Sequence, residues 1–141
     1  MTRQEALEIY KLEVQKFEGT RNSQWKFNFS LWTLLILVIY YVDKLDILNT
    51  YYFVFGLFVF TIHYFFVTQV QYSLESSKIL RSTIVNNLND PQKQNFIVDI
   101  KLKPKLSNLL SETFFARWII YQCSITLFLI LLLWARVYYF V

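Results

Sequence analysis

Side chains that could do chemistry are few in this chain, and the most conspicuous lies in its most apolar stretch. His63 is the single histidine, within a run from Ile47 to Leu74 that has no formal charge while the imidazole is neutral. An ionisable group inside a membrane is costly unless paired, which makes it a candidate functional site. It could carry protons, sense pH or line a pore. The alternative is a neutral imidazole bonded to a Tyr, Thr or Gln of a neighbouring helix.

Two further polar groups fall in the last apolar stretch. Gln122 and Thr126 lie one helical turn apart, so they share a face and suit hydrogen bonding between helices. They could pair with His63 or with a second copy of the chain. His63, Gln122 and Thr126 therefore form a candidate intramembrane polar site.

A second polar set stands where the first apolar stretch begins. Arg21, Gln24 and Asn28 continue a spacing of three and four residues and so share a helix face. If several copies stood in a ring, this face could line an aqueous pore mouth on the inner side. The alternative is a helix end hydrated by lipid headgroups.

Signals for catalysis are weak. The chain has no Gly-rich loop, no phosphate-binding motif and no His or Cys pair with metal spacing. No nucleophile accompanies a base, and the single cysteine, Cys123, excludes an intramolecular disulfide. We therefore expect neither an enzyme nor a cofactor or metal. Four further carboxylates are scattered along the sequence: Glu75, Asp90, Asp99 and Glu112.

The composition indicates a membrane protein. Hydrophobic residues make up 55% of the 141 residues and charged residues 17%, below the ~25% usual in soluble domains. About 20 apolar residues span a bilayer as a helix. Residues 27–42, 51–70 and 118–135 are the predicted spans, and the first is slightly short at 16 residues. Trp with Arg at both ends of the last run is typical of interfacial anchors. The predicted fold is all-α: a transmembrane hairpin, a C-terminal span and a long cytoplasmic N-terminal helix.

Residues 1–26 are predicted to form that amphipathic helix. Thr2 and Glu5 fit a capping box, and four apolar residues at spacings of three and four form one stripe. The other faces mix Lys with Glu, unlike a strongly basic helix that lies on anionic lipid. The stripe, spaced like heptad a and d positions, suits packing against another helix. The stripe could mediate self-association, or it could fold onto the chain's own cytoplasmic part. Its members are Leu7, Tyr10, Val14 and Phe17.

The segment 71–116 is predicted to be cytoplasmic, with an extension of the second span, a short extended run and a short helix. Val98, Ile100 and Leu102 alternate with charged residues, a strand-like period of two. The basic cluster is expected to contact anionic lipid. Nucleic acid is not an expected partner, since aromatic interleaving and a binding motif are absent. The cluster is Lys101, Lys103 and Lys105.

Charge predicts the orientation. Twelve of the fourteen Lys and Arg residues lie in residues 1–26 and 71–117, and only Lys44 and Arg136 lie on the other side. The positive-inside rule then places the N-terminus in the cytoplasm and the C-terminus outside. The expected location is the bacterial inner membrane, with the mitochondrial inner membrane as the alternative.

Residues 5–35, EALEIYKLEVQKFEGTRNSQWKFNFSLWTLL, followed by a second apolar helix, resemble a broad prokaryotic group. Its members are small membrane proteins with an amphipathic helix before a helical hairpin, including SLATT-type effectors of nucleotide-signalling defence systems and RipA-like octameric proteins. The resemblance implies homo-oligomers in the inner membrane and, for the SLATT type, a pore or disruption that kills an infected cell. The third span departs from the two-helix SLATT plan, and no functional residue carries over.

Three functions follow as hypotheses. The first is a homo-oligomeric inner-membrane protein acting as a pore-forming or membrane-disrupting effector of antiviral defence. The second is an accessory subunit of a larger membrane complex, such as a respiratory enzyme, with the strand-like run added to a partner's sheet. The third is a small proton- or ion-conducting protein, which depends on His63.

Overall fold

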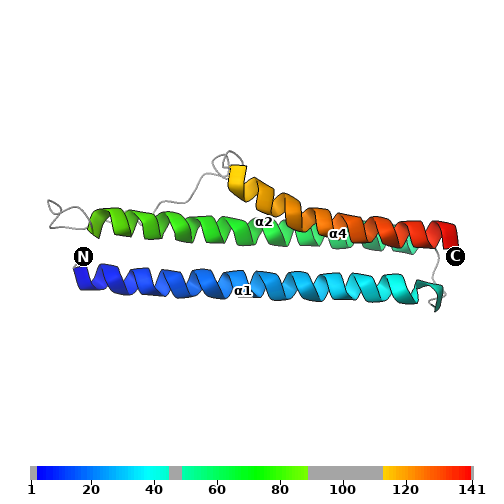
Figure 1. The fold of residues 1–141 in the computed structure, drawn as a ribbon, viewed down its shortest axis with the longest axis horizontal. Helices are drawn as coiled ribbons and strands as arrows, with labels where there is room; N and C mark the ends of the chain where they lie inside the picture. The colour runs from blue at the N-terminus through cyan, green and yellow to red at the C-terminus, as the bar shows by residue number, and fades with distance from the viewer. Residues whose placement is uncertain (1–2, 45–48, 89–112, 141) are drawn as a thin grey trace.

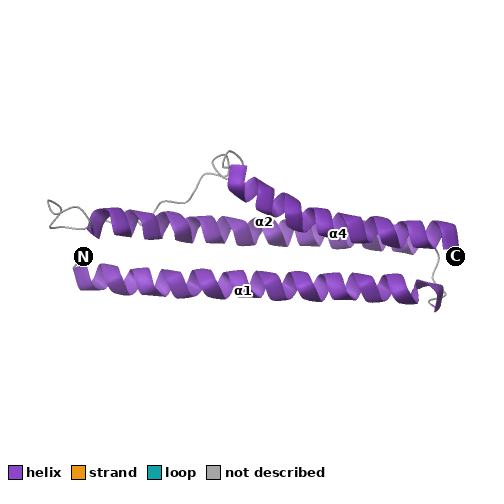
Figure 2. Cartoon of the chain, viewed as in Figure 1, coloured by secondary structure: helices purple, strands orange, loops and turns teal. Residues whose placement is uncertain are grey.

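The computed structural model describes residues 3–44, 49–88 and 113–140, and every element in these ranges is helical (Figure 2). The chain order is α1 (Arg3–Tyr41), η1 (Val42–Lys44), α2 (Asn49–Leu88) and α4 (Thr113–Phe140). The three long helices lie side by side, with the N- and C-termini at opposite ends of the bundle (Figure 1). All three are long and apolar enough to cross a membrane.

Helices α1 and α2 run antiparallel along their whole length because both carry an inward stripe with coiled-coil-like spacing. The buried residues of α2 recur every three or four positions, as at Gly56, Val59 and His63. On α1 the fully buried Leu35 and Asn28 are seven residues apart. Each helix is about 60 Å long at the α-helical rise, twice the thickness of a bilayer core. Two helices of this length can therefore continue to pack against each other beyond the bilayer core.

The separate cytoplasmic N-terminal helix predicted for residues 1–26 is wrong. The described part of that helix and the predicted span 27–42 form one element, α1, which as a whole is one of the three candidate spans. Gly19 costs a helix only about 1 kcal/mol relative to Ala, and proline is absent from this stretch. The equally long α2 packs along α1, and this packing outweighs the small cost of Gly19 to the helix.

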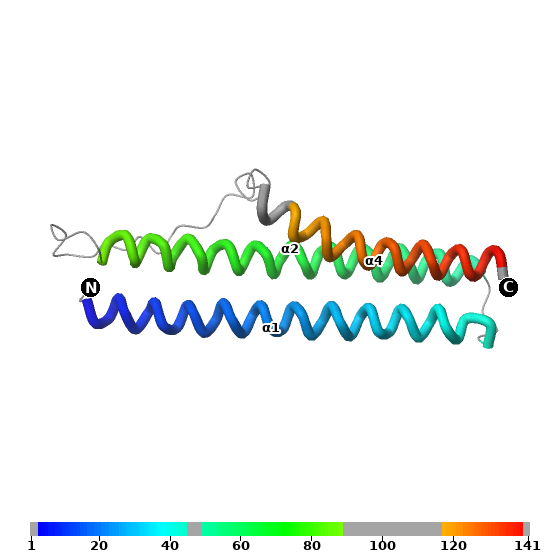
Figure 3. Tube along the Cα trace, in the orientation of Figure 1, coloured from blue at the N-terminus to red at the C-terminus, as the bar shows by residue number. Residues whose placement is uncertain are grey.

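The other two predicted spans lie within longer helices. Residues 51–70 are the first half of α2, which continues to Leu88 as the predicted helix extension. Residues 118–135 lie within α4, which runs beside α2 and diverges from it towards its own beginning (Figure 3). The predicted extended run at 98–102 and the Lys101, Lys103 and Lys105 cluster lie outside the described residues. The same holds for Leu106, Leu109 and Leu110 of the predicted short helix, whereas its Phe114 falls within α4.

The end of the bundle near the C-terminus has an apolar core. Leu35, Val59 and Ile130 pack together from the three helices. A second cluster follows towards the chain end and contains Val42, Tyr52, Leu133 and Val137. Arg136 pairs with Asp43 at 2.5 Å, which joins α4 to the end of the α1–η1 segment.

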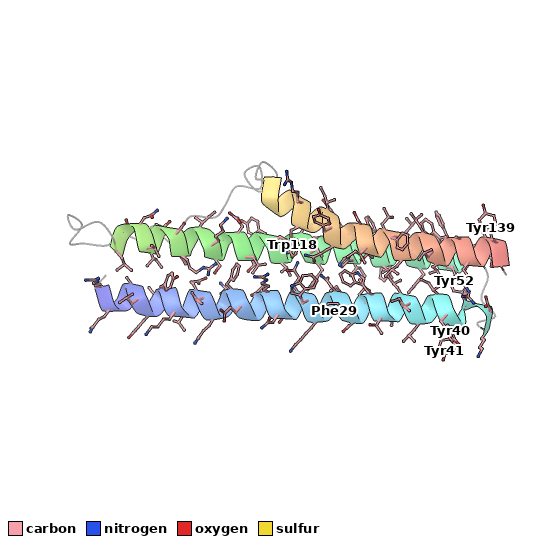
Figure 4. The ribbon with its side chains drawn as sticks, in the orientation of Figure 1. Phe29, Tyr40, Tyr41, Tyr52, Trp118 and Tyr139 are labelled. Atoms are coloured by element: carbon pink, nitrogen blue, oxygen red, sulfur yellow. The ribbon has the colours of Figure 1, made fainter. Side chains whose placement is uncertain are left out.

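Aromatic residues gather on the outside of that same end. Tyr40 and Tyr41 end α1, and Tyr139 lies near the end of α4 (Figure 4). All three are exposed, as are many large apolar side chains along the helices. An apolar exterior ending in tyrosines is the arrangement expected of helices whose outer surface faces lipid.

Candidate functional site

The centre of the bundle is a hydrogen-bonded polar group around His63. Its imidazole is completely buried between α1 and α4. Nε2 lies 3.0 Å from Oδ1 of Asn28, and Nδ1 lies 2.9 Å from Oγ1 of Thr126. The ring also stacks beside Phe27 of α1, with centroids 6.3 Å apart. One side chain of α2 therefore connects both neighbouring helices.

Gln122 of α4 closes the group on the side towards the N-terminus of α1. Its Oε1 accepts hydrogen bonds from Nδ2 of Asn28 at 2.6 Å and from Nε2 of Gln24 at 3.0 Å. Both donors are fully buried on α1, where residues four apart share a face. The amide pairs thus join α1 to α4 directly.

The pattern of donors assigns a hydrogen to Nε2 of the imidazole. Asn28 donates to Gln122 with its amino group, so its carbonyl oxygen faces His63 and requires a hydrogen on Nε2. Nδ1 is then the acceptor of a neutral ring and receives the Thr126 hydroxyl. Trp32 in turn donates from Nε1 to Oγ1 of Thr126 at 2.9 Å. Both ring nitrogens of a neutral His63 are therefore satisfied.

The group lies in the middle of the charge-free part of α4. At 1.5 Å per residue, Thr126 is about 15 Å from Arg136 and about 14 Å from Arg117. A buried polar layer is costly unless its members are bonded to one another. Such a layer also fixes which helix faces meet, because a rotation of any helix breaks several bonds at once.

The structure brings the predicted set His63, Gln122 and Thr126 into one site. Gln24 and Asn28 join that site from α1, whereas Arg21 is exposed. A pore mouth lined by Gln24 and Asn28 would require their bonds to Gln122 to open. The pairing of Asn28 with His63 and the role of Trp32 were not predicted. The available signal was the spacing of Gln24, Asn28 and Trp32, which places all three on one face of α1.

The predicted self-association stripe is partly used within the chain. Leu7 is exposed, whereas Tyr10, Val14 and Phe17 are half-buried. The guanidinium of Arg81 lies 4.2 Å from the Phe17 ring centroid, a cation–π contact between α2 and α1. Folding onto the chain's own second helix therefore accounts for Phe17.

Comparison with protein families, with curated proteins and with solved structures finds no match to this chain. Within residues 3–44, 49–88 and 113–140, no group of His, Cys, Asp and Glu could hold a metal ion. The fold thus defines an all-α chain with three candidate membrane spans and a buried histidine-centred polar site.

Proposed function

We propose that this chain is an integral membrane protein that assembles with copies of itself in the bacterial inner membrane. The observation that carries the proposal is the excess length of α1 and α2. Each is about 60 Å long, while a bilayer core needs about 30 Å. Residues 3–23 of α1 and 75–88 of α2 form the surplus, named here the projecting arm. The arm extends towards the end of the bundle that holds the N-terminus (Figure 1).

The arm is a defined unit and not a loose extension. Ala6 and Ile84 are completely buried on its two helices. The Ser77 hydroxyl donates to Glu13: its Oγ lies 2.7 Å from Oε2 and 3.2 Å from the backbone carbonyl. With the Phe17–Arg81 contact, these interactions hold the two helices at a fixed register along the arm.

Self-association is supported by apolar side chains that the arm exposes. Leu7, Leu12 and Val85 are 42%, 63% and 38% exposed. If the arm lies in water, a second copy can cover these side chains, and their burial favours assembly. Charged side chains on both helices of the arm, such as Lys11 and Arg81, support its location in water outside the bilayer core.

The finer role proposed is that of a membrane-perturbing effector. It is supported by the resemblance of residues 5–35 to SLATT-type proteins, which implies oligomers that disrupt the membrane of an infected cell. The Gln24 and Asn28 amides are hydrogen-bonded to Gln122 inside a single chain. We therefore assign the membrane perturbation to the assembled copies and not to a pore mouth built from these two amides.

Native mass spectrometry of the full chain, purified from its own host in mild detergent, tests the assembly. We expect multiples of the 17.1 kDa subunit. Leu7→Gln combined with Leu12→Gln should dissolve them. Glu8→Gln combined with Lys11→Gln is the matched control, because it changes two exposed polar residues of the same helix with no change in net charge. A single copy among unrelated subunits would instead support the accessory-subunit alternative.

The effector role has its own readout. Assembled wild-type protein in liposomes should release a trapped dye, and the Leu7→Gln, Leu12→Gln variant should release much less at equal incorporation. Assembly without any dye release would support a self-associating membrane protein and contradict the effector role.

A further inference from the structure

The buried polar side chains of the described helices lie level with His63 or on its arm side, and the core on the other side of His63 is apolar. Towards the projecting arm lie three buried amides, those of Gln122, Gln24 and Gln71. Towards the opposite end the ring is followed by Leu35, Val59 and Ile130, which pack against one another. His63 therefore marks the inner limit of the buried polar side chains, which share the arm side of the interior with Val67 and Leu74.

Two buried donors on the arm side of His63 have no hydrogen-bond partner among the described residues. They are the Nε2 atoms of Gln122 and Gln71, whose side chains are 98% and 99% buried. An unsatisfied buried donor is unfavourable, and a buried water is the usual acceptor where the protein supplies none. At the α-helical rise, Gln71 lies about 12 Å from His63 and Gln122 about 6 Å from Thr126, both on the arm side.

The bonds around His63 can also accommodate one additional proton. Oδ1 of Asn28 accepts the Nε2 hydrogen in either state of the ring. On the other nitrogen, Oγ1 of Thr126 lies 3.3 Å from the backbone carbonyl of Gln122. If the hydroxyl turns to that carbonyl, Oγ1 becomes an acceptor for a hydrogen on Nδ1. A hydroxyl oxygen has two lone pairs, so it can keep the bond from Trp32 as well.

We propose that His63 is a proton-binding site that water reaches only from the side of the projecting arm, with the Thr126 hydroxyl as its switch. The incoming proton is transferred from a hydronium at Gln122 to Oγ1 of Thr126. The original hydroxyl proton passes to Nδ1, and the new O–H bond points to the Gln122 carbonyl. One proton enters and one water is released from the hydronium. The product is an imidazolium whose two N–H groups both donate hydrogen bonds.

Other charged or titratable groups stand away from the ring. Those that contact it are Asn28 and Phe27 of α1 and Thr126 of α4, none of which titrates. Lys26 on α1 is exposed, Glu75 is twelve positions along α2, and the Cys123 thiol is three positions before Thr126 on α4. The protonation of the ring is thus assigned to its own hydrogen bonds and to water.

Nitrogen NMR of the full chain in liposomes tests the switch, and the single histidine gives an unambiguous signal. Near neutral pH we expect a ring with hydrogen on Nε2 only, and on acidification both nitrogens should become protonated while the helices remain folded. Thr126→Val should lower the proton affinity of His63 at least tenfold, and Thr126→Ser should restore it. Thr61→Val is the control, because Thr61 is exposed and its hydroxyl bonds the carbonyl of Leu57 in its own helix. A Thr126→Val titration equal to that of the wild type would overturn the switch.

Sidedness is tested with a membrane-impermeant thiol reagent on sealed vesicles of both orientations, in a Cys123→Ala background. Gln71→Cys and Gln122→Cys should react only from the arm side, whereas Leu35→Cys and Ile130→Cys should react from neither side. Gln71 lies outside the hydrogen-bonded group, so its variant remains informative if Gln122→Cys fails to fold. Reaction of Gln71→Cys from both sides, or from neither, would overturn one-sided access.

Discussion

Trp134 of α4 lies against the backbone of α2 at the one place where α2 has no side chain, Gly56. Nε1 of Trp134 donates to the carbonyl of Tyr52 at 3.2 Å, one turn before that glycine. A Cβ at position 56 would lie 2.8 Å from this nitrogen and 2.8 Å from Cγ2 of Ile130. The close approach of the two helices therefore depends on glycine, as in other helix contacts within membranes.

Gly56→Ala should consequently destabilise the protein. The added methyl group meets both α4 side chains below van der Waals distance, and overpacking of this kind costs about 1–3 kcal/mol. Reversible unfolding in mixed micelles, followed by helicity, measures the loss. Gly19→Ala is the matched control, because nothing lies within 4 Å of its added Cβ. There the better helix propensity of Ala should stabilise α1 by about 0.4–1 kcal/mol. Equal effects at both positions would contradict the close-packing role.

This contact illustrates which parts of the fold the sequence predicts. Charge-free runs and flanking Trp and Arg residues were sufficient to predict three apolar helices, because those patterns report the length of each span. They could not show that α1 is continuous, since helix ends near Gly19 depend on whether a partner helix packs there. They also could not predict that Gly56 faces Trp134, because the pairing of faces between helices depends on the packing of the whole bundle.

The polar site was predicted in part for a similar reason. His63 was recognisable because an ionisable residue in an apolar run needs a partner. The period of α4 placed Gln122 and Thr126 on one face, and both proved to be within the site. Asn28 was assigned to a pore mouth, since it shares a helix face with Arg21 and Gln24 where the first apolar stretch begins. Only the register of α1 against α2 shows that Asn28 contacts His63.

A double-mutant cycle between Asn28 and Gln122 should detect their coupling. Asn28→Leu leaves His63 Nε2 and Gln122 Oε1 each without one partner, and Gln122→Leu leaves the Asn28 and Gln24 donors without an acceptor. Hydrogen bonds between membrane helices contribute about 0.6 kcal/mol on average and up to about 1.7. We expect a coupling free energy in this range, at its upper end because the bond is 2.6 Å long and fully buried.

The control cycle pairs Asn28 with Thr61, which lies exposed on α2 and shares no bond with it. Additive losses in unfolding free energy are expected there. Additivity in the Asn28–Gln122 cycle as well would mean that the two amides do not interact in the folded protein.

The projecting arm should loosen when its polar contact is removed, while the spans should not. Ser77→Ala deletes the hydroxyl that bonds Glu13, while the Glu13 carboxylate keeps its exposed neighbour Lys16, 3.8 Å away. The Ser77–Glu13 bonds act in the arm together with the Phe17–Arg81 contact and the buried Ala6 and Ile84, so their loss should make local opening easier. Amide hydrogen exchange should rise in residues 6–20 and 75–88 and stay unchanged around His63. Ser82→Ala is the control, because Ser82 is exposed and its hydroxyl bonds the carbonyl of Ile79 in its own helix. Faster exchange throughout the bundle in Ser77→Ala would show that arm and spans open as one unit. In that case, the arm could not move independently of the spans.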